Sequence, residues 1–153
     1  MSYVIALENG VVAHDELMPL YRRHYGEMQA RLLSDGIEVG DFNPRIDEYH
    51  KAMNAGYLLT YVVRHEGAAV GYSNIYLTND MHNSEPIAQE DTIFIDKPHR
   101  NGIGKTLAKY ILEDLRARGV KRAHITAVTD LRVAKIWQRI GFRPVAQLLT
   151  YTF

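Results

Sequence analysis

The chain of 153 residues is long enough for one ordinary domain that buries about two-thirds of its unfolded surface. It contains no cysteine, which excludes disulfides, thiolate metal sites and cysteine nucleophiles and is typical of a reducing compartment. Neither a signal peptide nor a membrane-spanning run of roughly 18 apolar residues is visible. We therefore expect a single soluble, cytoplasmic domain over residues 1–153, with no metal site and no membrane partner.

The charges of the chain are divided along its length. The formal net charge is zero, which argues against a general nucleic-acid binder. Residues 1–96 carry 6 Lys/Arg against 15 Asp/Glu, a net of −9, whereas residues 97–153 carry 12 against 3, a net of +9. Two interpretations stay open: solvated faces that happen to segregate, or a bipolar site that binds a polyanion with its basic half and a cation with its acidic half.

The first third of the chain predicts one strand and two helices. Residues 3–7 form a short apolar run closed by the turn signal Asn9-Gly10, so they read as a strand. A helix follows from about His14, with apolar residues at helical spacing, and a shorter helix covers residues 46–54 and ends at Gly56. The loop between them holds Asp35, Glu38, Asp41 and Phe42. Its acids either line a substrate mouth or are simply solvated.

The middle of the chain is rich in β-branched and aromatic residues. Residues 57–64 and 68–77 are two such runs separated by His65-Glu66-Gly67, a pattern that predicts a β-hairpin. Residues 78–86 are polar and read as a loop, and residues 93–95 read as a strand that Pro98 stops.

The basic half contains the clearest helix, whose apolar stripe begins at Ile103 and which Gly119 ends. A strand at residues 123–128 follows, then a helix at 133–140 with Asp130 as N-cap, and a final strand within the tail 142–153, which contains LLTYTF. Strands and helices that interleave in this way predict a mixed α/β fold.

Residues 102–106, Gly-Ile-Gly-Lys-Thr, lie where a strand turns into this helix, which is a suitable place to hold a phosphate on backbone N–H groups. They also end like a nucleotide-triphosphatase loop, G-x-x-x-x-G-K-[ST]. The first glycine of that pattern falls on His99, whose side chain blocks the close backbone approach. No clear strand ending in a magnesium-binding aspartate follows, so we set the triphosphatase interpretation aside.

Two segments resemble the GNAT superfamily of N-acetyltransferases. Residues 90–104 (EDTIFIDKPHRNGIG) match its strand and Gln/Arg-x-x-Gly-x-Gly/Ala loop, and residues 134–142 (AKIWQRIGF) match its last helix and Gly-Phe exit. The resemblance implies a GNAT-like fold, a central, mostly antiparallel twisted sheet of six to seven strands flanked by about four helices. It also implies acetyl-CoA as cosubstrate, with the pyrophosphate on backbone amides from about Asn101 to Thr106. The cofactor residues it indicates are Phe94, Ile95, Arg100, Asn101, Gly102, Ile103, Gly104, Lys105 and Thr106.

The sequence departs from the family pattern at two positions. His99 stands where the family has Gln or Arg, and Arg100 lies one residue nearer the glycines. Trp137 stands where a tyrosine is frequent, and an indole N–H cannot protonate a departing thiolate near neutral pH. A thiol with a pKa of about 8 to 9 can leave as the thiolate, so activity does not require that tyrosine.

The resemblance places an acidic pair before the strand residues, so Glu90 is the first candidate for the catalytic base and Asp91 the second. Because strand side chains alternate, we expect only one of them to face the site and Asp91 to be a solvated carboxylate. His82, His99 and His124 are weaker candidates. A backbone N–H near Phe94 or Ile95 would hold the oxyanion.

The acidic first part of the chain favours an amine acceptor on a cationic small molecule or a protein. Tyrosines that either line its path or belong to the core are Tyr21, Tyr25, Tyr57, Tyr61, Tyr72 and Tyr76. A non-catalytic GNAT-fold module that binds CoA or a protein partner is the alternative, and Trp137 is the residue that favours it. A homodimer is compatible with the sequence.

Overall fold

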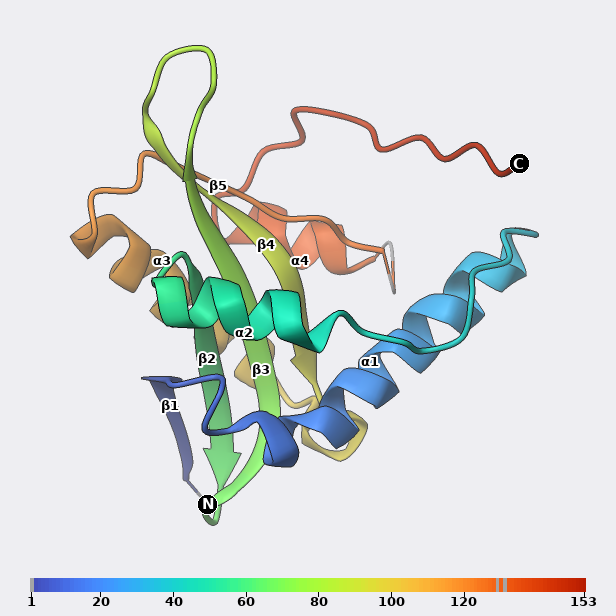
Figure 1. Ribbon diagram of the computed structural model, residues 1–153, viewed down its shortest axis with the longest axis horizontal. Coiled ribbons are helices and arrows are strands. Elements are labelled where there is room, and N and C mark those ends of the chain that lie inside the picture. The colour runs from blue at the N-terminus through green and yellow to red at the C-terminus, as the bar shows by residue number, and fades with distance from the viewer. Residues whose placement is uncertain (1, 129, 131) are drawn as a thin grey trace.

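The structure is a computed structural model that describes residues 2–128, 130 and 132–153. Its centre is a twisted sheet in the spatial order β1-β2-β3-β4-β5 (Figure 1). The first four strands pair antiparallel, whereas β5 runs parallel to β4. The strands are β1 (Tyr3–Glu8), β2 (Leu58–His65), β3 (Ala68–Asn79), β4 (Pro86–Ile95) and β5 (Arg122–His124).

Among the described residues four α-helices flank this sheet, in agreement with the expected number of about four. Helix α3 covers one face, while α1 and α2 lie on the opposite face (Figure 1). The mixed α/β class is confirmed. The helices are α1 (His14–Ser34), α2 (Ile46–Ala55), α3 (Ile103–Ala117) and α4 (Val133–Arg139), with a 3₁₀ turn η1 (Lys97–His99) before α3.

Each face of the sheet has its own apolar cluster. On the α3 side, Leu107 and Ile111 pack on inward-facing strand residues such as Tyr61 and Val63. On the α1 side, Leu17 and Leu20 pack with residues such as Val62, Tyr72 and Phe94. Because β2 is covered on both faces, it reads as an almost continuous buried run rather than an alternating one. β2 and its partner β3 therefore form the rigid base beside which β4 is placed.

The strands differ from the sequence prediction in three regions of the chain. The polar stretch 78–86 is shorter as a loop, because β3 extends to Asn79 and β4 already begins at Pro86. The strand predicted at 123–128 is hydrogen-bonded only as β5, after which the chain diverges from β4. The predicted strand within 142–153 does not form, and the sheet has five strands among the described residues rather than six or seven. A strand needs a neighbouring strand, and local preference cannot supply one.

Candidate active site

A groove opens where β4 and β5 separate. The two strands pair over three positions, from Ile87↔Arg122 to Gln89↔His124, and residues 125–128 then diverge. The groove has a volume of about 700 Å³ and is lined by β4, the start of α3, residues 126–128 and α4. Along this groove one backbone edge of β4 has no strand beside it among the described residues, so its N–H groups are available to a ligand.

The backbone of Ile95 shows which groups face the groove. In an antiparallel ladder the N–H and C=O of one residue leave the strand on the same side. The Ile95 carbonyl oxygen accepts a hydrogen bond from Arg100 Nε at 2.8 Å, whereas the next residue, Asp96, donates its N–H to Val70 of β3. The Ile95 N–H therefore also points away from β3 and into the groove, where it can donate to a developing oxyanion.

A β-bulge changes the alternation of β4 at the acidic pair. Asn74 pairs with Thr92 but Ile75 pairs with Glu90, so Asp91 is an extra residue without a partner in β3. Asp91 and the next residue, Thr92, therefore both lie on the side of α1 and α2, whereas Glu90 lies on the α3 side. Glu90 and Asp91 both line the groove. The expectation that only one of them faces the site is wrong for this groove, because the groove is open to both faces of β4 and is lined by residues of α1 as well as α3.

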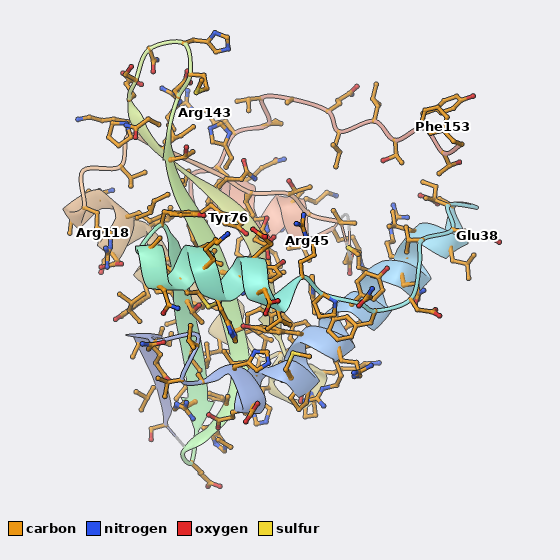
Figure 2. The ribbon with its side chains drawn as sticks, viewed as in Figure 1. Glu38, Arg45, Tyr76, Arg118, Arg143 and Phe153 are labelled. Carbon is orange, nitrogen blue, oxygen red and sulfur yellow. The ribbon has the colours of Figure 1, made fainter. Side chains whose placement is uncertain are left out.

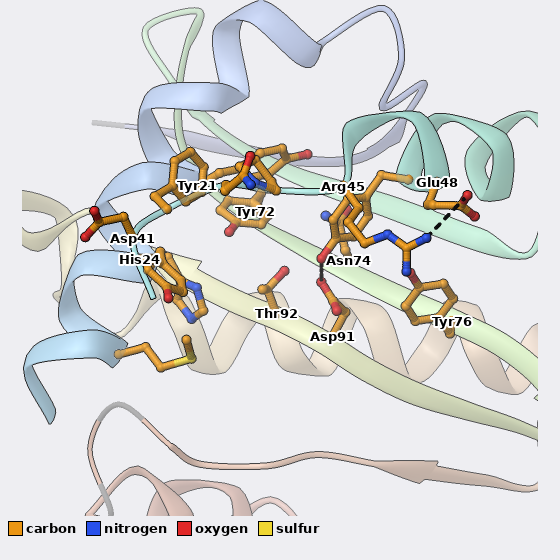
Figure 3. Close-up of a pocket in the computed structure, with 16 residues that line it drawn as sticks. Tyr21, His24, Asp41, Arg45, Glu48, Tyr72, Asn74, Tyr76, Asp91 and Thr92 are labelled. Atoms are coloured by element: carbon orange, nitrogen blue, oxygen red, sulfur yellow. Dashed lines mark hydrogen bonds and ion pairs between the residues drawn. The ribbon is translucent and has the colours of Figure 1, made fainter. Parts of the chain in front are cut away.

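A second cavity of about 500 Å³ lies on the α1 and α2 side of the sheet (Figure 3). Asp91 and Thr92 project into it from β4, and Tyr21, Tyr72 and Tyr76 form part of its wall. The carboxylates that line it are Asp41, Glu48 and Asp91, and the aromatic residues are Tyr21, Tyr25, Phe42, Tyr49, Tyr72 and Tyr76. His24, Met28 and Asp91 line both the cavity and the groove. The two spaces therefore meet at the bulge.

The acidic pair is held in an environment that favours its neutral form. Burial, with a smaller contribution from the neighbouring charge of Asp91, raises the pKa of Glu90 to about 7, against the effect of a 3.2 Å hydrogen bond from the Thr126 N–H. Burial also raises the pKa of Asp91, against the effect of a 3.0 Å hydrogen bond from the Tyr49 hydroxyl. Asp91 is thus a half-buried, hydrogen-bonded group rather than the solvated carboxylate that we expected.

The turn before α3 forms an amide cradle at the mouth of the groove. Gly102 has φ of +101°, a conformation that favours glycine, and an added Cβ would meet no atom within 4 Å. No side chain caps this helix start. The N–H groups of residues 102–104 lack partners within the helix, and the positive end of its dipole points toward the groove mouth. An anion such as a pyrophosphate fits this position by its charge.

Some of the cofactor residues that the sequence indicated line the groove, and others do not. Phe94, Arg100 and Lys105 line the groove together with Ile95, Gly102 and Gly104. Ile103 is instead buried in the core under α3. The side chain of Asn101 donates to the Tyr3 hydroxyl at 3.1 Å, and neither Asn101 nor Thr106 lines the groove. For these three residues a contact with a ligand in the groove would have to come from the backbone.

The family assignment follows from comparison with known proteins. The profile of the Acetyltransferase (GNAT) family matches residues 15–142. The chain belongs to the GNAT acetyltransferase family. A search of curated protein sequences gives no significant match.

Solved structures place this GNAT acetyltransferase among proteins of the same fold. An aminoglycoside acetyltransferase, HMB0005, from an uncultured soil metagenomic sample is 19% identical with a TM-score of 0.73, covering 100% of this chain and 99% of that one. Ribosomal-protein-alanine N-acetyltransferase from Brucella melitensis biovar Abortus 2308 is 18% identical, TM-score 0.73, with 99% of both chains covered. A mutant of the BH1408 protein from Bacillus halodurans is 17% identical, TM-score 0.78, with coverage of 98% and 99%. At such identities the likeness concerns the fold.

The two departures from the GNAT pattern can now be placed. His99 Nδ1 is hydrogen-bonded to the Tyr3 hydroxyl at 3.1 Å and packs near His65, so it braces the end of the sheet instead of the groove. Arg100 lies over Phe94 and donates to Glu27 at 2.6 Å, so it supports the end of β4 from within the groove. Trp137 is 6% exposed and lines the groove, and its Nε1 has no hydrogen-bond partner in the described chain.

The remaining candidate residues of this GNAT domain either line the cavity or lie outside both the cavity and the groove. Tyr57 and Tyr61 line neither the cavity nor the groove, whereas the other four tyrosines singled out in the sequence line the cavity. The candidate bases His82 and His124 also lie outside both spaces. Sequence reasoning missed Tyr49, which carries no signal beyond its position in a short helix, and His24, whose pKa burial lowers.

No group of three or more His, Asp or Glu side chains among the described residues could hold a metal ion. Over the same residues, the search for a helix both long and apolar enough to cross a membrane finds none.

Proposed function

We propose that this protein transfers an acetyl group from acetyl-CoA to a primary amine, with acetyl-CoA in the groove and the amine in the aromatic cavity. The observation that carries the proposal is the junction of the two spaces at Asp91, beside a carboxyl group with a pKa of about 7. An unperturbed lysine-type amine has a pKa of about 10.4 and must lose a proton before it can attack. A base with a pKa near neutrality is well matched to that task.

Glu90 accepts this proton, and Asp91 binds the incoming ammonium group at the junction. The amine nitrogen then forms a bond to the acetyl carbon, and the Ile95 N–H donates to the carbonyl oxygen as it gains negative charge. The carbon–sulfur bond breaks, and the sulfur leaves as a thiolate, which the thiol pKa of about 8 to 9 permits. The second proton lost from the nitrogen neutralises that thiolate, and Glu90 returns its proton to water.

The cradle at residues 102–104 supports acetyl-CoA as the acetyl donor. Its backbone N–H groups and helix dipole would hold the pyrophosphate, with Lys105 adding positive charge at the same mouth. The indole N–H of Trp137, which lacks a partner among the described residues, would donate a hydrogen bond to the ligand in the groove. This role needs no proton transfer from tryptophan, so the replaced tyrosine does not contradict acetyl transfer.

The cavity favours a cationic small molecule with a flat or apolar body. Its walls are mainly aromatic, and it has Asp41 and Glu48 in addition to Asp91. Glu48 is paired with Arg45 at 3.6 Å, so Asp41 and Asp91 are the carboxylates left to attract a cation. Aromatic faces and carboxylates together stabilise an ammonium group. An amine on an aromatic or alicyclic body should therefore be acetylated faster than one of similar size that carries many hydroxyl groups.

Variants of the two carboxyl residues test the proposed roles. Glu90→Gln should lower kcat about 100-fold or more, the range of general-base catalysis, and should remove the fall in rate below pH 7. Asp91→Asn should mainly raise KM for the amine. Asp114→Asn is the matched control. Asp114, on α3, accepts a hydrogen bond from the Tyr61 hydroxyl and lines neither the groove nor the cavity. The proposed base is wrong if Glu90→Gln retains the wild-type pH–rate profile.

The non-catalytic alternative predicts a different outcome from the same panel of amines. Wild-type protein would then bind CoA, seen as a thermal shift, but would turn over no amine on the panel. Loss of CoA binding on substitution of Gly102, without any turnover by the wild type, would support a CoA-binding module and overturn the enzymatic proposal.

A further inference from the structure

The cavity on the α1 and α2 side has an exposed mouth and a buried floor. Arg45, at the start of α2, and Tyr76 of β3 border the cavity beside α2 (Figure 2), and the Arg45 side chain is 82% exposed. The floor is the face of the sheet, where Tyr72 and Asn74 of β3 are 1% and 2% exposed. A ligand gives up its contacts with water at this floor. The polar groups of the floor therefore have the largest influence on which ligand binds.

A row of polar side chains crosses the sheet at this floor. Thr60 of β2 is the register partner of Asn74, and Asn74 is the register partner of Thr92 of β4. Side chains that are paired in this way have Cβ atoms about 4.5–5.5 Å apart. The Thr60 hydroxyl donates to Asn74 Oδ1 at 2.8 Å. Because this bond uses the amide oxygen, the amide nitrogen of Asn74 is left to donate to another group.

Two buried hydroxyl groups of the cavity lack hydrogen-bond partners within the described chain. They are Tyr21 Oη, from α1, and Thr92 Oγ1, from β4, and both side chains line the cavity. Burial raises the pKa of Tyr21, and the nearby Asn74 amide acts in the opposite direction, so this amide lies beside the Tyr21 hydroxyl. A buried hydroxyl without a partner is costly, and a ligand atom that pairs with it removes that cost. The floor therefore favours a ligand with one polar group at this position.

The bulge in β4 sets the distance between this polar group and the proposed amine position. Asp91 and Thr92 are adjacent in the chain, and both project into the cavity (Figure 3). Because adjacent Cα atoms are only about 3.8 Å apart, a ligand with its ammonium group at Asp91 reaches Thr92 Oγ1 with an atom about two or three bonds from the nitrogen. Two other hydroxyls of the wall already have partners, since Tyr25 donates to the Gly40 carbonyl and Tyr49 donates to Asp91.

We propose that the acceptor is an amino alcohol with an aromatic body, in which the carbon next to the amine-bearing carbon carries the hydroxyl. The inference rests on the proposed acetyl transfer and names the acceptor of that same site. The ammonium group lies at Asp91, and the hydroxyl lies between Thr92 and Tyr21. Its oxygen accepts from Tyr21 or from the Asn74 amide, and its proton is donated to Thr92 Oγ1. A carboxylate at this position is disfavoured by Asp41 and Asp91, which line the same cavity.

Three amines with the same carbon skeleton test the position of the hydroxyl. 2-Phenylethylamine has no hydroxyl, 2-amino-1-phenylethanol has one on the carbon next to the aminomethyl group, and its isomer tyramine has one on the ring. Calorimetry at pH 7 with CoA present compares their binding as ammonium ions and needs no turnover. The dissociation constant of 2-amino-1-phenylethanol should be lower than the other two by about tenfold or more. Equal constants, or no binding of any of the three, would overturn the proposal.

Thr92→Val tests whether the floor recognises the hydroxyl, because it removes the Thr92 hydroxyl and keeps the shape of the side chain. The preference for 2-amino-1-phenylethanol over 2-phenylethylamine should fall to about twofold or less, and Thr92→Ser, which keeps a hydroxyl, should retain it. The Tm of Thr92→Val should not fall, because this hydroxyl has no partner to lose. Thr78→Val is the matched control, on an exposed position of β3 that lines neither the cavity nor the groove. An unchanged preference in Thr92→Val would refute the assignment.

Turnover of the same amines with acetyl-CoA separates this inference from the proposed function. Acetylation of 2-phenylethylamine, together with equal dissociation constants for the three amines, would support acetyl transfer and refute the amino-alcohol acceptor. Selective binding of 2-amino-1-phenylethanol that depends on the Thr92 hydroxyl, without acetylation of any amine, would retain the binding site and refute acetyl transfer.

Discussion

Replacing Glu90 by glutamine tests the charge state of the carboxyl group beside the bulge. Its pKa is about 7 in the folded protein, mainly because of burial, against an ordinary value of 4.5. Between these two values the unfolded chain ionises while the folded protein keeps the proton. The folded state therefore loses stability as the pH rises from about 4.5 to 7, and the loss is complete above that window. The gap of about 2.5 pH units, at about 1.4 kcal/mol each, corresponds to roughly 3 kcal/mol.

Glutamine does not ionise, yet its side-chain oxygen can still accept from the Thr126 N–H. The stability of Glu90→Gln relative to wild type should thus increase with pH, reaching about 3 kcal/mol more at pH 8 than at pH 4. For a chain of this size the corresponding change in Tm is on the order of 6–12 °C. Urea unfolding of both proteins at a series of pH values measures the difference directly, since most other groups cancel.

Asp114→Asn provides a control in which the stability relative to wild type should change with pH in the opposite direction. Hydrogen bonds from Tyr61 and Arg118 lower the pKa of Asp114 despite some burial, so its contribution to stability is present at neutral pH and is lost as the pH falls. This variant should be less stable than wild type at pH 8 and converge with it in acid. If the curves of wild type and Glu90→Gln run parallel from pH 4 to 8, Glu90 has an ordinary pKa and is not the poised base.

Further substitutions address the cavity, the sheet and the cradle. Tyr49→Phe should change KM for the amine, whereas Tyr61→Phe, which also removes a hydroxyl bonded to an aspartate, should lower Tm and leave the kinetic constants unchanged. Gly71→Ala should lose about 1–3 kcal/mol in denaturant unfolding, because its Cβ would lie 2.5 Å from Ile95 Cδ1 and 2.9 Å from a backbone oxygen. Gly102→Ala should weaken acetyl-CoA binding in calorimetry and cost about 1–2 kcal/mol through its positive φ. Unchanged binding by Gly102→Ala would exclude the cradle as the phosphate site.

The sequence predicted those elements whose signals are local. The apolar stripe of α3 and the glycines at positions 56, 119 and 141 gave helix positions within a few residues, because periodicity and a left-handed φ are properties of short segments. The β2–β3 hairpin was found for the same reason. The amide cradle also depends on neighbouring residues only, and its position at the start of α3 follows directly from the glycines.

The features that depend on distant partners could not be predicted. The bulge at Asp91 is a mismatch between β3 and β4, so no pattern within β4 alone reveals it. The hydrogen bond from Tyr49 joins residues 42 positions apart, and the cavity walls come from two helices, a loop and two strands. The tail reads as a strand by composition, but whether it pairs is decided by a neighbour that lies outside the segment.

The extra residue in β4 has a consequence for how this protein could diversify. Glu90 and Asp91 belong to opposite layers of the sheet, as adjacent residues of a strand do, and yet both border the groove. The insertion places Asp91 beside Thr92 on the cavity side, while Glu90 stays on the α3 side. Substitutions among the cavity residues on α1 and α2 can therefore alter which amine is accepted, without moving Glu90 or the cradle on the opposite layer. The binding of the acetyl donor and the choice of the acceptor amine can then change independently. Asp91, the extra residue of β4, is the point at which the two spaces meet.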